Sequence, residues 1–190
     1  MPAPGNLILR FTDEQLSGLG QDLLHTRTYN ALGALNDADG DGWRWDGERR
    51  LLLSGTALAV GSSLTRTTGD GHETVYAWNG TSYQSTEGDG AHDFIRWDSK
   101  TSEWYWTDGS TRRVERYDRE GRLASVRDSQ GTLVSYGYQN GRLSSVSDSS
   151  GQALVMVYNT AGKLERLDTR ALANGPLTRQ VYYSYDNHGR

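Results

Sequence analysis

The sequence contains no cysteine, three prolines and two phenylalanines among its 190 residues. The absence of cysteine excludes disulfide bonds and thiolate metal sites. No run approaches the ~20 consecutive apolar residues that a membrane-spanning helix needs. The opening MPAPGNLILR also lacks the basic start and apolar core of a signal peptide. We therefore expect neither a transmembrane segment nor a signal peptide in this chain.

Strong charge of one sign is also missing. Residues 1–110 carry a formal charge of −8 and residues 111–190 carry +4, so the sum is −4. The basic residues of the second part alternate with acidic ones instead of forming a patch. This pattern is typical of a mixed, solvated surface and argues against nucleic-acid binding.

Glycine is abundant, with 23 residues, and part of it is periodic. In four of the repeat units a glycine is followed seven residues later by the unit's aromatic residue, and these aromatic residues recur about every 20 residues. Two residues before most of these aromatic residues, the sequence has another large or branched residue. In the copy that ends at Tyr117 the glycine spacing is eight, and Val114 is the residue assigned to the matching place. The glycine–aromatic pairs are Gly71 and Trp78, Gly90 and Trp97, Gly131 and Tyr138, and Gly151 and Tyr158.

This period predicts one β-hairpin per unit. Residues at i and i+2 lie on the same face of a strand, so Tyr136 and Tyr138 point the same way. Glycines in the polar segments between strands, such as Gly121, Gly141 and Gly162, supply the positive φ of tight turns. One hairpin cannot bury its aromatic row alone, so neighbouring hairpins pair edge to edge. We predict an all-β fold: a curved antiparallel sheet of repeated hairpins that forms an open segment of a larger wall.

Each unit also contains two apolar residues three positions apart, as in Leu123 and Val126. A spacing of three puts them on opposite faces of a regular strand. Either a β-bulge intervenes or both faces of the strand are partly covered.

The repeat divides the chain into three segments. Residues 1–68 form a β segment that precedes the repeats, residues 69–116 carry degenerate repeats rich in tryptophan, and residues 117–190 carry regular repeats. The last unit begins with Tyr185 and is expected to be cut off by the end of the chain.

The stretch YDREGRLASVRDSQGTLVSYGY, residues 117–138, resembles the YD repeat, also called the Rhs repeat. That motif has Tyr-Asp, two residues, Gly-Arg-Leu, a hydrophobic strand, a turn glycine and Tyr-x-Tyr. Residues 138–164 resemble a second copy, and YSYDNHGR at 183–190 the start of a third. The stretch before the repeats is similar to the segment that precedes them in Rhs-type proteins.

The resemblance implies a large bacterial protein that is secreted, injected or exposed on the cell surface. In such proteins the repeats form a hollow β-shell around a toxic C-terminal cargo, and related shells occur in insecticidal toxin complexes, wall-associated proteins and teneurins. The partners would then be the remaining repeats and the toxin cargo. Many members also carry a self-cleavage motif with an Asp-Pro pair, and no proline here follows an aspartate. We therefore expect a non-catalytic structural segment of such a shell.

The segment DADGDGWRWDGE, residues 37–48, matches the spacing of a calcium-binding loop. Asp37, Asp39, Asp41 and Glu48 stand at positions where side-chain oxygens can converge on one Ca²⁺ ion. The alternative is an acidic turn between strands, since aspartate and glycine are common in turns.

The segment WDSKTSEWYWTDG, residues 97–109, concentrates aromatic residues. Exposed rings of Trp104 and Trp106 would form a stacking platform for sugars or a partner surface, whereas buried rings would belong to the core. The alternative function is therefore a carbohydrate- or protein-binding adhesion module. No nucleophile elbow, zinc-protease helix or phosphate loop is present, so we do not expect an enzyme. Unpaired strand edges predict self-association.

Overall fold

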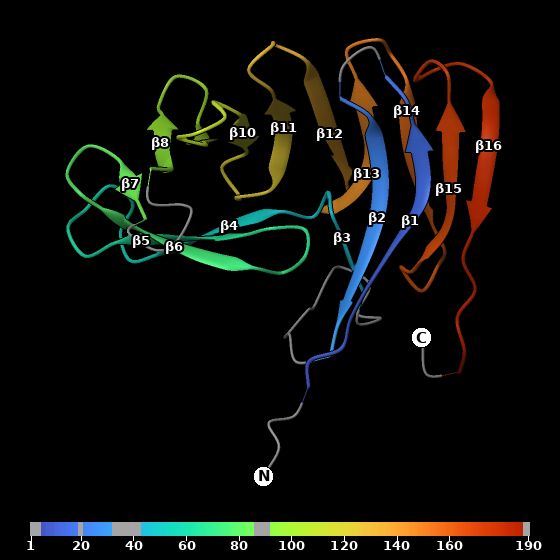
Figure 1. Ribbon diagram of the computed structural model, residues 1–190, viewed down its shortest axis with the longest axis horizontal. Helices are drawn as coiled ribbons and strands as arrows, with labels where there is room; N and C mark the ends of the chain where they lie inside the picture. The colour runs from blue at the N-terminus through green and yellow to red at the C-terminus, as the bar shows by residue number, and fades with distance from the viewer. Residues whose placement is uncertain (1–4, 19–20, 32–42, 86–91, 188–190) are drawn as a thin grey trace. The chain divides into compact units, whose positions relative to one another are not determined.

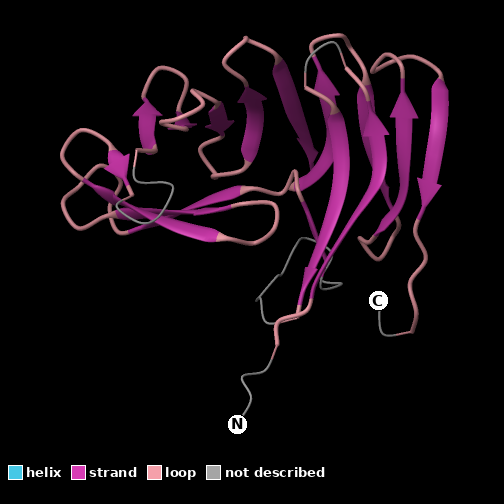
Figure 2. Ribbon diagram, in the orientation of Figure 1, coloured by secondary structure: helices cyan, strands magenta, loops and turns pink. Residues whose placement is uncertain are grey.

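The computed structural model describes residues 5–18, 21–31, 43–85 and 92–187. These residues form sixteen strands and no helix, so they contain no helix that could cross a membrane (Figure 2). The predicted all-β class is confirmed. The strands are β1 Ile8–Leu16, β2 Leu23–Asn30, β3 Trp43–Trp45, β4 Arg50–Ser54, β5 Ser63–Thr67, β6 Glu73–Trp78, β7 Tyr83–Gln84, β8 Phe94–Asp98, β9 Glu103–Thr107, β10 Val114–Tyr117, β11 Leu123–Arg127, β12 Leu133–Gln139, β13 Arg142–Asp148, β14 Ala153–Tyr158, β15 Leu164–Arg170 and β16 Leu177–Tyr182.

The strands belong to two antiparallel sheets (Figure 1). The first has the order β1-β2-β3. The second has thirteen strands, and their order from β4 to β16 is the order of the sequence. A sheet without crossovers is what hairpins following one another along the chain produce, because each strand pairs with the next one.

The chain forms two compact units. Unit 1 comprises residues 1–48, 69–71 and 137–190, and unit 2 comprises residues 49–68 and 72–136. The sequence segments 1–68, 69–116 and 117–190 divide the chain by repeat pattern and stay a prediction.

The repeat glycines that the structure describes have the backbone conformation expected of turns. Six of them have φ between 78° and 91°, a range that side-chain-bearing residues rarely adopt. Gly90 lies outside the described residues. The six are Gly71, Gly121, Gly131, Gly141, Gly151 and Gly162.

β-Bulges explain why the two apolar residues of a unit are three positions apart. Between β10 and β11, Arg116 pairs with Ser125 and Tyr117 pairs with Leu123, so Ala124 is the extra residue. Between β14 and β15 the same shift leaves Glu165 as the extra residue. The bulge brings Leu123 and Val126 to the same buried face, both at 0% exposure. Of the two alternatives left open by the sequence, the bulge is present in these two copies.

Unit 2 has its core on the aromatic face of the repeats. Tyr76, Ile95 and Tyr117 are 0–1% exposed, and Trp78 and Trp97 pack against them as partly buried neighbours. These are the repeat positions at the aromatic residue or two residues before it, so the predicted aromatic row forms the core of this unit.

The sheet of unit 2 curls until its first strand meets its eighth. The backbone N–H of Leu51 donates to the carbonyl oxygen of Gly121 at 2.8 Å, and the N–H of Leu123 donates to that of Arg49 at 3.3 Å. Arg50 and Arg122 thereby form a β-bridge between β4 and the start of β11. The predicted curvature is present in unit 2, and part of the edge of β4 is already paired.

Unit 1 stacks two sheets. Its three-stranded sheet β1-β2-β3 lies against β13–β16, as the contacts of Glu14 with Thr169 and of Trp45 with Tyr183 show. A bulge between Thr12 and Glu14 lets both acidic side chains of β1, at positions 13 and 14, bond to groups of the facing layer.

Candidate functional site

The segment Tyr-Asp-x-x-Gly-Arg-Leu at residues 117–123 shows what each residue of the repeat motif contributes. Tyr117 and Leu123 are fully buried in the core of unit 2. Between them, Asp118 accepts a hydrogen bond from the backbone N–H of Arg122 at 2.8 Å and one from its Nε at 2.7 Å. Gly121, with φ 78°, donates its N–H to the Asp118 carbonyl and closes the turn. The motif thus combines two core anchors with a side-chain-stabilised turn.

The same kind of turn recurs between other pairs of adjacent strands. Asp128 accepts hydrogen bonds through Oδ1 from the N–H groups two and four residues later, both at 2.9 Å, and Asp148 does the same at 2.9 Å. Asn159 makes the equivalent pair at 3.0 Å. Each turn is therefore fixed by one short polar side chain followed three residues later by glycine.

Successive units are connected by tyrosine. The hydroxyl of Tyr158 donates to the carbonyl oxygen of Leu143 at 2.8 Å, and that of Tyr185 donates to the carbonyl of Leu164 at 2.8 Å. In both cases the acceptor is the leucine of the preceding Gly-Arg/Lys-Leu segment. The cation of that segment, Arg142 in the first case, lies over the same ring at 5.7 Å from its centroid. At these two places, one unit thus bonds to the next through a hydrogen bond and a cation–π contact.

The interior of unit 2 contains a buried ionic network centred on Glu115. Its carboxylate is 0% exposed. Oε2 accepts from Nε and Nη2 of Arg66 at 2.9 and 2.7 Å and from the Tyr117 hydroxyl at 2.6 Å. Arg49 bonds to Oε1, and Arg113 lies 3.6 Å from the same oxygen. Three arginines from β5 and from segments beside β4 and β10 thus converge on one carboxylate.

These contacts decide the protonation state of the network. Burial alone would raise the pKa of Glu115, but the charges of Arg49 and Arg66 and the Tyr117 hydrogen bond outweigh it and lower this pKa to about 2. The pKa of Tyr117 is raised well above its ordinary value by burial and by Glu115. The network is therefore an ionised carboxylate held by arginines and a neutral phenol, an arrangement suited to holding strands together rather than to proton transfer.

The position of Glu115 corrects one prediction. The residue two before the aromatic Tyr117 on the buried face is Glu115, whereas Val114 lies on the opposite face and is only partly buried. The assignment of Val114 to that place was wrong, because the extra residue of this copy lies in the turn before β10 and not in the strand.

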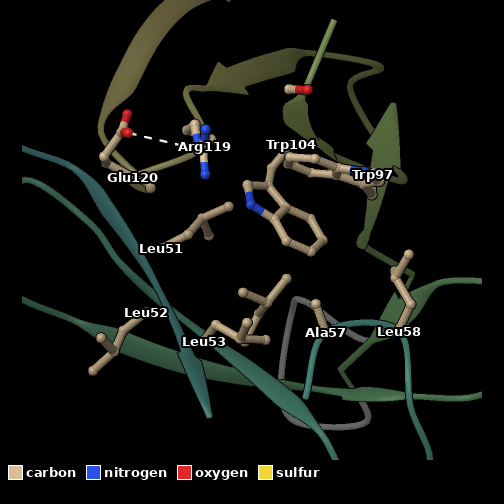
Figure 3. A pocket seen from close by; sticks show the side chains of 12 residues that line it. Leu51, Leu52, Leu53, Ala57, Leu58, Trp97, Trp104, Arg119 and Glu120 are labelled. Carbon is tan, nitrogen blue, oxygen red and sulfur yellow. Dashed lines mark ion pairs between the residues drawn. The ribbon is translucent and has the colours of Figure 1, made fainter. Parts of the chain in front are cut away.

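A cavity of about 610 Å³ opens beside the first strand of unit 2 (Figure 3). Leu51 and Leu53 of β4 point toward the indole of Trp104, with Trp97 beside it, while Leu52 points away. The two indoles pack with centroids 4.6 Å apart. Most residues that line the cavity are apolar. At its edge, Arg119 and Glu120 form an exposed ion pair, with Nε and Oε1 3.8 Å apart.

The tryptophans predicted as a stacking platform lie in the core. Trp104 is 6% exposed and Trp106 is 5% exposed. The Nε1–H of Trp106 donates to the Tyr76 hydroxyl at 2.9 Å, and Arg66 lies 3.8 Å over its ring centroid. Core packing, the alternative that the sequence left open, describes their environment.

The acidic segment predicted to bind calcium falls mostly outside the described residues, which include Glu48 but not Asp37, Asp39 or Asp41. Glu48 is 6% exposed, and its backbone carbonyl accepts from Nη2 of Arg44 at 2.5 Å. The described part of the chain contains no cluster of three or more potential metal ligands. Calcium binding at this segment stays a prediction.

Comparison with protein families supports the interpretation of the repeat. Residues 117–153 match the family model described as RHS Repeat. The chain carries the RHS repeat. The matched residues include the turn at Asp118–Gly121, the bulged strand β11 and more than half of the next unit. No curated protein matches the chain significantly.

The RHS repeat explains why these residue types recur, but its sequence signature did not indicate every functional contact. The aspartates of the turns were expected as turn formers, and their dual hydrogen bonds follow from the Asp-x-x-Gly spacing. The Glu115 network was missed, because nothing in the local pattern distinguishes a buried glutamate from a solvated one. Its only signal is that Glu115 precedes Tyr117 by two residues and so shares a face with it.

Proposed function

We propose that this chain is a structural wall segment of an Rhs-type β-shell that encloses a toxic C-terminal cargo in a bacterial protein that is secreted, injected or presented on the cell surface. The segment has no catalytic role of its own in this proposal. The RHS repeat supports a structural repeat protein, and the cargo and the route of delivery go beyond that.

The observation that carries the proposal is the identical connection between successive units. Tyr158 bonds to Leu143 as Tyr185 bonds to Leu164. Four turns are closed in the same way, by a glycine N–H that donates to the carbonyl of an aspartate or asparagine three residues earlier. A unit therefore needs only its neighbours, and the same contacts can be repeated to build a wall of any length. Such a wall can become large enough to surround another domain.

The absence of catalysis is supported by the use that the site makes of its ionisable groups. The buried carboxylate of unit 2 is neutralised by arginines, and the neighbouring phenol stays protonated. A general acid or base would need a pKa near the working pH and access to a substrate. Glu115 has neither.

The proposal is tested by protease protection of the natural polypeptide that contains this sequence. We expect the region that follows the repeats to resist added protease in the wild type and to become cleavable in Glu115→Ala, which breaks the interior network of unit 2. The exposed Glu120→Ala variant is the matched control and should keep the protection. Equal cleavage in all three proteins, or a natural polypeptide with no separate domain beyond the repeats, would refute enclosure.

A further inference from the structure

The histidine of strand β2 is buried in unit 1 without a hydrogen bond to its ring nitrogen Nε2. His25 is 4% exposed, and Nε2 has no partner among the described residues. Its ring packs on the indole of Trp45, with centroids 3.8 Å apart and planes 33° apart. A buried polar atom without a partner is rare in folded proteins and calls for an explanation.

The carboxylate opposite His25 in the sheet is bonded to other groups. Glu14 stands opposite His25 in the β1–β2 register. Its carboxylate accepts a hydrogen bond from the hydroxyl of Thr169 on β15 at 3.2 Å and one from Nη1 of Arg179 on β16 at 3.3 Å. Glu14 is thus used to hold the three-stranded sheet against the facing one.

The positive charge that acts on His25 is that of Arg27, two residues along the same strand. It donates two hydrogen bonds to Asp13 at 2.7 and 2.9 Å, and Asp13 also accepts from the Tyr183 hydroxyl at 3.1 Å. From the third strand, Trp45 packs edge-on against Tyr183 with centroids 5.6 Å apart. His25 therefore lies where the two layers of unit 1 meet, under the influence of a cation, and no acceptor in the described part of unit 1 bonds to its Nε2.

This environment favours the neutral ring. Burial, and then the charge of Arg27, lower the pKa of His25 from 6.5 to about 3. Above pH 6.5 the imidazole is neutral whether unit 1 is closed or open, so it contributes no pH dependence. Below pH 6.5 an opened state binds a proton that the closed state does not, and acid therefore favours opening.

We propose that His25 is an acid-sensitive latch that releases the three-stranded sheet of unit 1 from the facing strands β13–β16 when its imidazole takes up a proton. The imidazolium can be accommodated in two ways. It can take the carboxylate of Glu14 from Thr169 and Arg179, or it can reach water as the two layers separate. Either response breaks contacts between the layers. This inference goes beyond the proposed function, because it concerns the stability of the chain itself and does not require a cargo.

The test is amide hydrogen exchange, followed residue by residue by NMR between pH 4.5 and 7. Protection of the β2 amides is compared with that of β9 in unit 2 within the same sample, so that the intrinsic pH dependence of exchange cancels. Uptake of one proton predicts that opening of β2 relative to β9 increases by up to about tenfold for each pH unit below 6.5. Over two pH units the increase approaches about 100-fold.

Two variants separate the latch from general acid sensitivity. His25→Gln cannot titrate, so we expect the relative opening of β2 to become nearly independent of pH in this range. His72→Gln removes an exposed histidine and should behave like the wild type. An unchanged pH profile in His25→Gln would overturn the proposal.

A direct measurement covers the case in which His25→Gln does not fold. The ring resonances of His25 in the wild-type chain report its protonation in the closed state. We expect no titration step near pH 6.5 while unit 1 is closed. A normal titration at that pH, with β2 protection unaffected, would equally refute the latch, and neither result depends on whether the parent protein encloses a cargo.

Discussion

Removal of the buried carboxylate of unit 2 should be among the most destabilising single changes in the chain. In Glu115→Ala, Arg66 loses both hydrogen bonds to Oε2, and the Tyr117 hydroxyl loses its acceptor. The side chains of Arg66 and Arg49 are only 9% and 12% exposed, so water cannot readily take the place of the Glu115 carboxylate as their hydrogen-bond partner. Removing one partner of a buried ion pair costs about 3–5 kcal/mol, and we expect a loss in that range.

The assay is equilibrium unfolding in urea followed by tryptophan fluorescence, to which Trp78, Trp97, Trp104 and Trp106 of unit 2 contribute. The matched control is Glu120→Ala, which removes an exposed carboxylate from the neighbouring turn and should cost less than about 1 kcal/mol. Glu115→Gln preserves the shape but not the charge and should fall between the two. Equal, small losses in Glu115→Ala and Glu120→Ala would refute the assigned role.

The same network gives a signed pH dependence. The pKa of Glu115 is lowered from 4.5 to about 2, so its contribution to stability is complete above pH 4.5 and is lost as the pH falls toward 2. Unit 2 of Glu115→Gln should therefore lose less stability than wild-type unit 2 over this interval. This pH interval lies below the interval tested for His25 in unit 1, so the two pH effects can be measured separately.

Four further changes test other parts of the molecule. Tyr158→Phe removes the hydrogen bond to Leu143 and should cost about 0.5–1.5 kcal/mol in urea unfolding, more than Tyr182→Phe, whose hydroxyl is exposed. Gly121→Ala should cost about 1–3 kcal/mol more than Gly131→Ala, because both have positive φ but only the added methyl at 121 meets the backbone of Leu51; equal losses would contradict the close approach. Leu52, 70% exposed on β4, should promote self-association through strand edges, and sedimentation velocity should show less of it in Leu52→Lys; a monomeric wild type would contradict this. Isothermal titration with Ca²⁺ should give heat for the wild type and less for Asp39→Ala, and no heat in either would exclude the predicted site.

The architecture could be predicted from the sequence because its determinants are local. Alternation of apolar residues, glycine in the polar turns and the 20-residue period are all contained within one unit. The pairing of Leu123 with Val126 on one face required a bulge, which the sequence permitted but did not select over its alternative. The bulge depends on how Arg116 and Tyr117 pair across the strands, and that register is a property of two strands together.

The contacts that depend on distant segments could not be predicted. Glu115 and Arg66 are 49 residues apart, and Glu14 and Thr169 are 155 apart. The bridge of Arg50 to Arg122 likewise requires the sheet to curl through eight strands before the two can meet. A repeat pattern specifies which neighbour each strand pairs with but not how far the sheet turns. For the same reason, the sequence did not distinguish exposed from buried indoles at Trp104 and Trp106.

The bonds from the Tyr158 and Tyr185 hydroxyls to the leucine of the preceding unit have a consequence for how genes of this type can change. Because the acceptor is a backbone carbonyl, it is present whatever side chains the preceding unit carries. Unequal recombination that inserts or removes one whole unit would therefore join two strands that already fit. Chain length can then vary in steps of about 20 residues without new compensating substitutions, whereas a fractional unit would shift the pleat and turn the apolar face outward.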